Sequence, residues 1–153
     1  MFRRYILLIV AVPLFAAGDL AQSGRPGAPS APKALIGFLR KKQYADRYGC
    51  TYSVRGGTRT IFFDEALNGG PEALMRIDGQ DVRVKYVGAA RPLGGRVRTG
   101  QREVLHYAAP GIKVKVIRFT GREVGSGVNY SGTITVSKGN RRQVARFTGW
   151  CGA

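Results

Sequence analysis

From Gly49 onward, apolar and polar residues alternate with a period of two in short segments, separated by glycine-rich and Pro-Gly turns. The alternating segments are Cys50–Arg55, Arg59–Asp64, Asp81–Gly88, Arg102–Ala108, Ile112–Phe119, Val128–Ser137 and Arg142–Trp150. Connections this short allow antiparallel pairing and leave no room for crossover helices. The pattern therefore predicts an all-β domain of seven to eight strands, folded as a small antiparallel barrel or as a sandwich.

Residues 34–48 follow a different pattern. Four apolar residues between Leu35 and Leu39 precede a basic stretch, and Gly49 could end a helix. The segment predicts a short N-terminal amphipathic helix. Two roles are open for it: it packs its apolar side onto the sheet, or it docks on a membrane surface or a partner.

The N-terminus resembles an export signal. Arg3 and Arg4 precede an apolar run and the small residues Ala16-Ala17-Gly18, so we expect a signal peptide at residues 1–18, with an uncleaved anchor as the alternative. Residues 19–34 are rich in Pro, Gly, Ser and Ala and predict a flexible linker. Residues 35–153 then form a single β domain. No cysteine lies where a lipoprotein would carry one, so we expect a soluble protein, periplasmic or secreted.

The chain has two cysteines. Cys50 lies in the first predicted strand and Cys151 directly follows the last one. In an oxidising compartment such a pair predicts a disulfide that joins the first and last strands and favours barrel closure. A metal or redox role is not indicated, because no CxxC spacing and no histidine cluster accompanies the pair.

Positive charge dominates the composition. Lys and Arg total 25 against 9 Asp and Glu, and without Arg3 and Arg4 the formal net charge is about +14. Such a surface attracts polyanions, including lipopolysaccharide phosphates, anionic lipids, teichoic acids and, without specificity, nucleic acid. The alternative is that the charge mainly keeps an exported protein soluble.

The side chains that catalysis needs are scarce. His106 is the one histidine and lies in a strand-like segment with no serine motif nearby. Asp64 and Glu65 are adjacent, and Asp78 and Asp81 flank a turn. The sequence therefore predicts a non-enzymatic protein without a metal or another cofactor.

Basic residues supply two candidate anion-binding surfaces. The first is a glycine-rich hairpin tip with four arginines, Arg91, Arg96, Arg98 and Arg102. Guanidinium groups suit phosphate and sulfate oxygens because each presents a planar fork of donors; the alternative is a solvated loop without a function. The second is a set of same-face strand pairs, namely Arg83 with Lys85, Lys113 with Lys115, and Arg142 with Arg146. These pairs form one cationic patch if the strands align them, and otherwise they are the solvent side of the sheet.

Tyrosines offer stacking beside these charges. The candidates are Tyr44, Tyr48, Tyr52, Tyr86, Tyr107 and Tyr130, with packing in the core or at its rim as the alternative role.

Two short motifs near the C-terminus match known signatures. Ser126, Gly127 and Tyr130 fit SGxxY, and Ser137, Lys138 and Gly139 fit S/T-K-G. Together they resemble the signatures of the periplasmic and membrane-bound inhibitors of C-type lysozyme, which are small antiparallel β-barrels with a disulfide. The resemblance implies that Ser126 and Lys138 reach into the lysozyme cleft and meet its catalytic carboxylates.

A longer stretch, from Tyr48 to Gly152, resembles a family of uncharacterised small exported bacterial β-domain proteins. The elements that carry the resemblance are Tyr48-Gly49-Cys50, Ile61-Phe62-Phe63, the segment from Ala73 to Gly79, and the segment from Phe147 to Gly152. This resemblance implies a fold without a function. The hypothesis from sequence is thus an exported, non-enzymatic binding module for an anionic cell-envelope component. The alternatives are a periplasmic inhibitor of C-type lysozyme and a structural protein that docks a protein partner through a sheet edge.

Overall fold

The structure, a computed structural model, describes residues 33–65, 72–89 and 98–152. The expected signal peptide and most of the expected linker lie outside these residues. The described elements are β1 (Ile36–Gly37), the 3₁₀ turn η1 (Lys41–Gln43), β2 (Gly49–Val54), β3 (Thr60–Asp64), β4 (Glu72–Ile77), β5 (Gln80–Ala89), β6 (Arg102–Ala109), β7 (Ile112–Val124), β8 (Gly127–Lys138) and β9 (Arg141–Gly152). All seven predicted strands are confirmed, with bounds that shift by a few residues.

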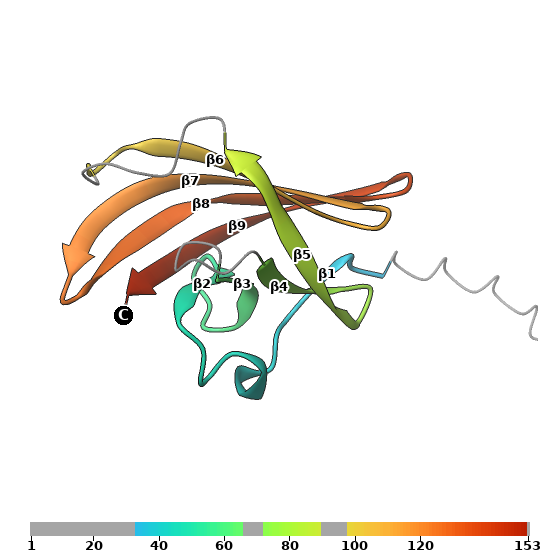
Figure 1. The fold of residues 1–153 in the computed structure, drawn as a ribbon, viewed down its shortest axis with the longest axis horizontal. Coiled ribbons are helices and arrows are strands. Elements are labelled where there is room, and N and C mark those ends of the chain that lie inside the picture. Colours follow the sequence, from blue (N-terminus) through green and yellow to red (C-terminus); the bar gives the residue numbers. More distant parts are fainter. Residues whose placement is uncertain (1–32, 66–71, 90–97, 153) are drawn as a thin grey trace, which may run out of the picture. The chain divides into compact units, whose positions relative to one another are not determined.

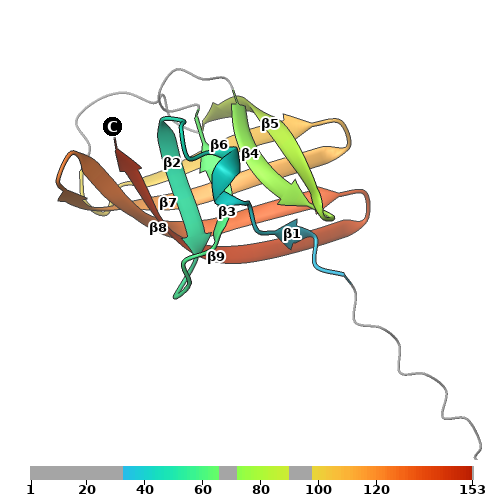
Figure 2. The same cartoon turned by 90° about the horizontal axis from the view of Figure 1, so that it is seen from below.

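The strands close into an antiparallel barrel of eight strands, so the prediction of a barrel or sandwich resolves to the barrel. The order is β4-β3-β2-β9-β8-β7-β6-β5, and pairing between β4 and β5 closes the ring. The short strand β1 adds to β4 beyond the end of β3. Figure 1 shows the long, curved strands β6–β9 on one side, and Figure 2 shows β2–β5 crossing in front of them. Closure matters because it pairs the edges that an open sheet would expose.

The predicted N-terminal helix is wrong. Residues 34–48 instead contain β1 and a single 3₁₀ turn. The backbone is held extended because both backbone N–H groups of Leu35 and Ile36 donate to the Gln143 side chain, at 2.7 and 2.9 Å, and Leu39 N–H donates to the Thr60 carbonyl at 2.8 Å. These tertiary hydrogen bonds prevail over a weak local helix preference.

The apolar side chains of this segment do pack onto the sheet, which is one of the two roles expected from the sequence. Leu39 and Tyr44 cover Phe63 and Leu74, which face outward from β3 and β4. The Tyr44 and Phe63 rings stack at 5.3 Å between centroids. Strand β4 was missed by the period-two pattern because this cover buries its outward side chain Leu74 as well as its inward ones.

The barrel interior is filled by large aromatic and branched side chains. Tyr52, Phe62, Tyr107 and Phe147 are each at most 2% exposed and meet in tilted or edge-to-face pairs with centroids 4.7–5.6 Å apart. Such pairs contribute roughly 0.5–1.5 kcal/mol beyond the burial of their area. The interior is therefore a packed core.

The disulfide is confirmed. Cys50 of β2 and Cys151 of β9 are directly opposite each other in the ladder, with Cα atoms 4.1 Å apart. The bond spans a sequence separation of 101 residues, and closing such a loop stabilises the fold by about 4.7 kcal/mol in the chain-entropy model. Because β1 precedes β2, the bond joins the second of the described strands to the last of them. Among the described residues, no helix has the length and apolarity that a membrane span requires.

Candidate anion-binding site

Alternate residues of β5–β9 point out of the barrel and align across the ladder. Lys85 is opposite Ala108, which is opposite Lys113; Lys113 is opposite Ser137, which is opposite Arg142. The next row places His106 opposite Lys115 and Lys115 opposite Thr135. We call the four residues Lys85, Lys113, Lys115 and Arg142 the cationic face; His106 lies next to Lys115 on it.

The spacing of the cationic face lets its charges act together. Lys85 and Lys113 are two strands apart, as are Lys113 and Arg142, and each step between strands is about 4.8 Å. Neighbouring cations in the row are thus roughly 10 Å apart, close to the Debye length at physiological ionic strength. The potentials overlap, and an anion at the centre of the row is attracted by several of them.

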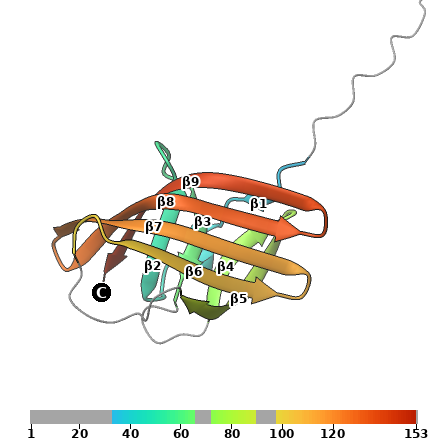
Figure 3. The same ribbon diagram turned by 90° about the horizontal axis from the view of Figure 1, so that it is seen from above.

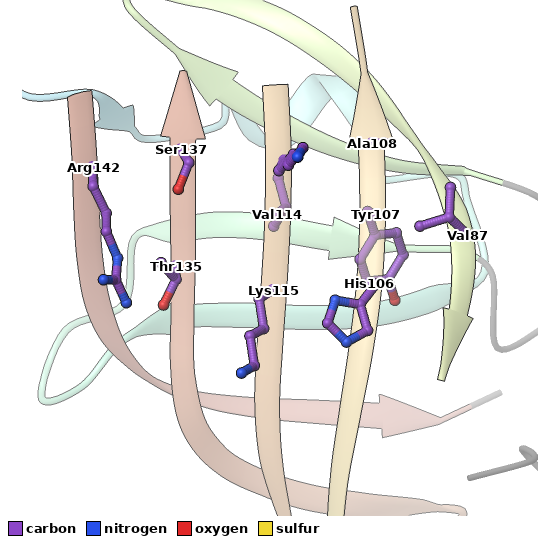
Figure 4. Close-up of a pocket in the computed structure, with 10 residues that line it drawn as sticks. Val87, His106, Tyr107, Ala108, Val114, Lys115, Thr135, Ser137 and Arg142 are labelled. Carbon is purple, nitrogen blue, oxygen red and sulfur yellow. The ribbon is translucent and has the colours of Figure 1, made fainter. Parts of the chain in front are cut away.

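A depression of about 450 Å³ lies on this face. Figure 4 shows Arg142, Lys115 and His106 projecting from β9, β7 and β6, with Thr135 and Ser137 of β8 between the first two. Val87 borders the depression from β5, where a bulge places Val87 between the paired residues Tyr86 and Gly88. Cationic ends and hydroxyl groups together provide donors for an oxyanion.

Carboxylates do not neutralise these cations. Within the part of the chain that the structure describes, Lys85, Lys113, Lys115 and Arg142 form no ion pair, although Glu72 of β4 is opposite Lys85 in the ladder. The ion pairs are Arg47–Glu65, Arg76–Asp81, Arg83–Glu72, Arg118–Glu103, Lys138–Asp78 and Arg141–Asp78. Arg83, predicted together with Lys85, therefore differs from it: its guanidinium donates to Glu72 at 3.3 Å.

Other predicted residues lie near this face but not in it. Arg102 begins β6 and Arg146 lies on β9, each exposed on the outer wall and four residues from His106 or Arg142, roughly 13 Å along the strand. Arg98 is exposed in the segment before β6. Arg91 and Arg96 lie outside the described residues. From the sequence, His106 is an ordinary strand residue, because spacing along one strand does not show that Lys113 and Lys115 lie across the ladder from it.

Five of the six candidate tyrosines pack in the core or against another ring and so do not supply stacking at the cationic face, although Tyr107 borders its depression. Tyr52, Tyr107 and Tyr130 are buried in the barrel, and Tyr86 contacts Tyr107 edge-on at 5.5 Å between centroids. Burial raises the pKa of the Tyr52 and Tyr107 hydroxyls, so both stay protonated at neutral pH.

The two motifs of the lysozyme-inhibitor resemblance lie at opposite ends of β8. Ser126 is in the turn between β7 and β8, whereas Lys138 ends β8, roughly 40 Å of extended chain away. Tyr130 lies inside the barrel, and the Lys138 ammonium donates to Asp78 at 2.8 Å. That hydrogen bond, with a second from Arg141, lowers the pKa of the Asp78 carboxyl below its usual range.

The described residues contain no group of three or more His, Cys, Asp or Glu side chains that could hold a metal ion. Comparison with known protein families, with curated proteins and with solved structures finds no match for this chain.

Proposed function

We propose that this protein is an exported, non-enzymatic binding module that holds an anionic cell-envelope component on its cationic face. The observation that carries the proposal is the cross-strand row of Lys85, Lys113 and Arg142, none of which forms an ion pair with a described carboxylate. Unpaired surface cations do little for folding, so the position of Lys113 and Arg142 in the lining of one depression, with Lys85 in the same row beside it, favours a ligand.

Two further features support this assignment. The formal net charge of +16 draws polyanions from a distance, and the local row then provides the contacts. The disulfide belongs to proteins of oxidising compartments, and the first 18 residues resemble an export signal. A ligand with clustered phosphate, sulfate or carboxylate groups on the outside of a cell fits both.

The test compares a variant of the face with a matched control. Lys85→Gln/Lys113→Gln/Arg142→Gln removes three charges from the row, and Lys41→Gln/Lys42→Gln/Arg55→Gln removes three exposed charges elsewhere. Binding to lipopolysaccharide and to vesicles containing an anionic lipid is titrated at several salt concentrations. We expect the face variant to weaken binding at least about tenfold. The slope of the logarithm of the binding constant against the logarithm of the salt concentration should fall by up to about three, one for each lost phosphate contact. The control should have a far smaller effect on both quantities.

Three results would overturn the proposal. Equal losses in both variants would mean that total charge, and not the cationic face, attracts the ligand. Stoichiometric binding of a C-type lysozyme with loss of its activity would favour the inhibitor. Salt-insensitive association with a protein would favour docking through a sheet edge, for which the described strands leave little room because the barrel is closed.

A further inference from the structure

The outward residues of β8 form a row without a single charge. They are Asn129, Ser131, Thr133, Thr135 and Ser137, in strict alternation with the inward residues. Figure 3 shows β8 between β7 and β9 along this wall of the barrel. None of these five side chains forms a hydrogen bond with another described residue. We call this row the hydroxyl row. Hydroxyl and amide groups both donate and accept, so they match a ligand that is itself rich in hydroxyl groups.

An exposed tryptophan lies beside one end of the hydroxyl row. Trp150 of β9 is opposite Asn129 of β8 on one side and Thr51 of β2 on the other, and 38% of its surface is exposed. A Cβ atom at Gly127 or at Gly152 would collide with the indole ring, so glycine at both positions lets the ring lie directly on the backbone. This support holds one flat apolar surface at a fixed place on the wall.

A second depression, of about 270 Å³, adjoins the indole ring. Its lining comprises Thr51, Ser53, Gly57, Asn129, Thr148, Gly149 and Trp150, none of which is charged. The volume is slightly below the range of complete small-molecule pockets, roughly 300–1,000 Å³, and suits one unit of a longer chain. The flat indole ring, with hydroxyl and amide groups around it, matches a sugar ring, whose C–H face is apolar and whose rim carries hydroxyl groups.

The two depressions share the hydroxyl row. Asn129 lines the one beside Trp150, whereas Thr135 and Ser137 line the one on the cationic face. The distance from Asn129 to Ser137 is roughly 27 Å along the strand. A chain of sugar units laid along β8 would therefore reach the indole ring with one unit and the unpaired cations with its acidic groups.

We propose that the ligand is an anionic glycan, a chain of sugars that carries phosphate, sulfate or carboxylate groups, bound along β8 from Trp150 to the cationic face. The proposal rests on the proposed function and narrows its ligand class. Single-stranded nucleic acid is the competing polymer with both charge and stacking units. It needs cations next to the stacking platform to hold its phosphates, and the described lining of the depression beside Trp150 has none. Arg146, exposed on the same side of β9, is four residues from Trp150, roughly 13 Å along the strand.

Trp150 is the only tryptophan in the sequence, so its fluorescence reports directly on this depression. The purified protein is titrated with dextran sulfate, with inorganic polyphosphate of matched charge, with neutral dextran and with an oligo-dT strand. We expect dextran sulfate to bind and change the Trp150 emission, polyphosphate to bind without changing it, and neutral dextran to bind far more weakly than dextran sulfate.

Variants then separate sugar contacts from charge contacts. Asn129→Ala/Thr148→Ala keeps the indole ring and should weaken dextran sulfate binding about five- to tenfold, since each lost hydrogen bond is a modest contribution. It should change polyphosphate binding less than about twofold. Asn140→Ala makes the same amide change in the turn between β8 and β9 and should leave both affinities unchanged. Trp150→Phe retains a flat ring and should bind dextran sulfate better than Trp150→Ala.

The outcomes distinguish the two proposals. If dextran sulfate and polyphosphate bind equally well and neither changes the emission, the glycan assignment is overturned and the cationic module stands. If oligo-dT changes the emission and loses more affinity than dextran sulfate in the Asn129→Ala/Thr148→Ala variant, the polymer is nucleic acid and the glycan assignment is again overturned. If no polyanion binds, the proposed function itself is overturned.

Discussion

Basic side chains are paired inside the barrel, whereas those of the cationic face on its outside form no ion pair with a described residue. Inside, the Arg118 side chain is 2% exposed and contacts three other side chains. Its Nε donates to Glu103 at 2.5 Å, its Nη1 donates to the Tyr52 hydroxyl at 3.0 Å, and the guanidinium lies 4.4 Å from the Tyr130 ring centroid. Burial alone would lower the pKa of Arg118, but Tyr52 and Glu103 outweigh it and raise that pKa, so the charge persists.

Outside, Lys113 and Lys115 are exposed and form no ion pair with any described residue. The same strand, β7, carries both arrangements, because successive residues point to opposite sides of the sheet. A buried charge must have partners or the fold does not form, whereas an exposed charge is hydrated and needs none. The comparison therefore assigns Arg118 to stability, and it separates this residue from the cationic face, for which we propose a role in binding.

The largest expected effect is on the inside. Arg118→Ala leaves Glu103 without its cation and the Tyr52 hydroxyl without its donor, so we expect a loss of about 3–5 kcal/mol in the free energy of unfolding. Denaturant unfolding with the disulfide intact measures it. Arg118→Met/Glu103→Gln, which removes both charges, should recover part of the loss. A loss under about 1 kcal/mol in Arg118→Ala would show that the buried pair is not structural.

A second buried polar contact should have a smaller effect. The Tyr107 hydroxyl donates to the carboxylate of Asp64 at 2.6 Å, and Asp64 is completely buried. Tyr107→Phe removes that donor and should destabilise the fold by about 1–3 kcal/mol. Tyr48→Phe, at a side chain that is 74% exposed, is the matched control and should change the stability by less than about 0.5 kcal/mol.

Substitutions on the cationic face should change the free energy of unfolding very little in the same assay. Lys85→Gln/Lys113→Gln/Arg142→Gln should shift the free energy of unfolding by less than about 0.5 kcal/mol for each site, because no described partner is lost. A combined loss above about 2 kcal/mol would erase the distinction between the two regions, since the cations would then serve the fold.

The alternation of apolar and polar residues predicted most strands of the barrel, but it did not predict that residues 34–48 would pack over β3 and β4. Alternation identified the strands that have one solvated side, and the two cysteines indicated which strands meet. Strand β4 escaped because Leu39 and Tyr44 cover its outer side chain Leu74, which removes the alternation. The helix was wrong because Gln143, more than a hundred residues away, accepts the hydrogen bonds that fix β1.

The candidate site could not be predicted from the spacing of residues along single strands, because it depends on how neighbouring strands align. A two-residue interval correctly placed Arg83 with Lys85 on one face, but nothing local indicated that Glu72 would bind Arg83 and leave Lys85 free of an ion pair within the described residues. Alignment of Lys85 with Lys113 and Arg142 required the order of five strands. The hydroxyl row was readable from the sequence as five alternate Asn, Ser and Thr residues, yet only the position of Trp150 beside it suggests a ligand.

The smallest expected effect concerns outer cations that do have a partner. Lys138 and Arg141 both donate to Asp78, and these hydrogen bonds lower the pKa of its carboxyl. A lowered pKa in the folded state stabilises the fold above the ordinary value of 3.8, and this contribution disappears as the pH falls through the folded value. In Lys138→Gln the pKa of Asp78 should rise and still stay below 3.8, because Arg141 remains. A carboxyl NMR titration measures both values, with Lys113→Gln as the control. An unchanged pKa would mean that Lys138 is free in solution, like the lysines of the cationic face, and available to a ligand.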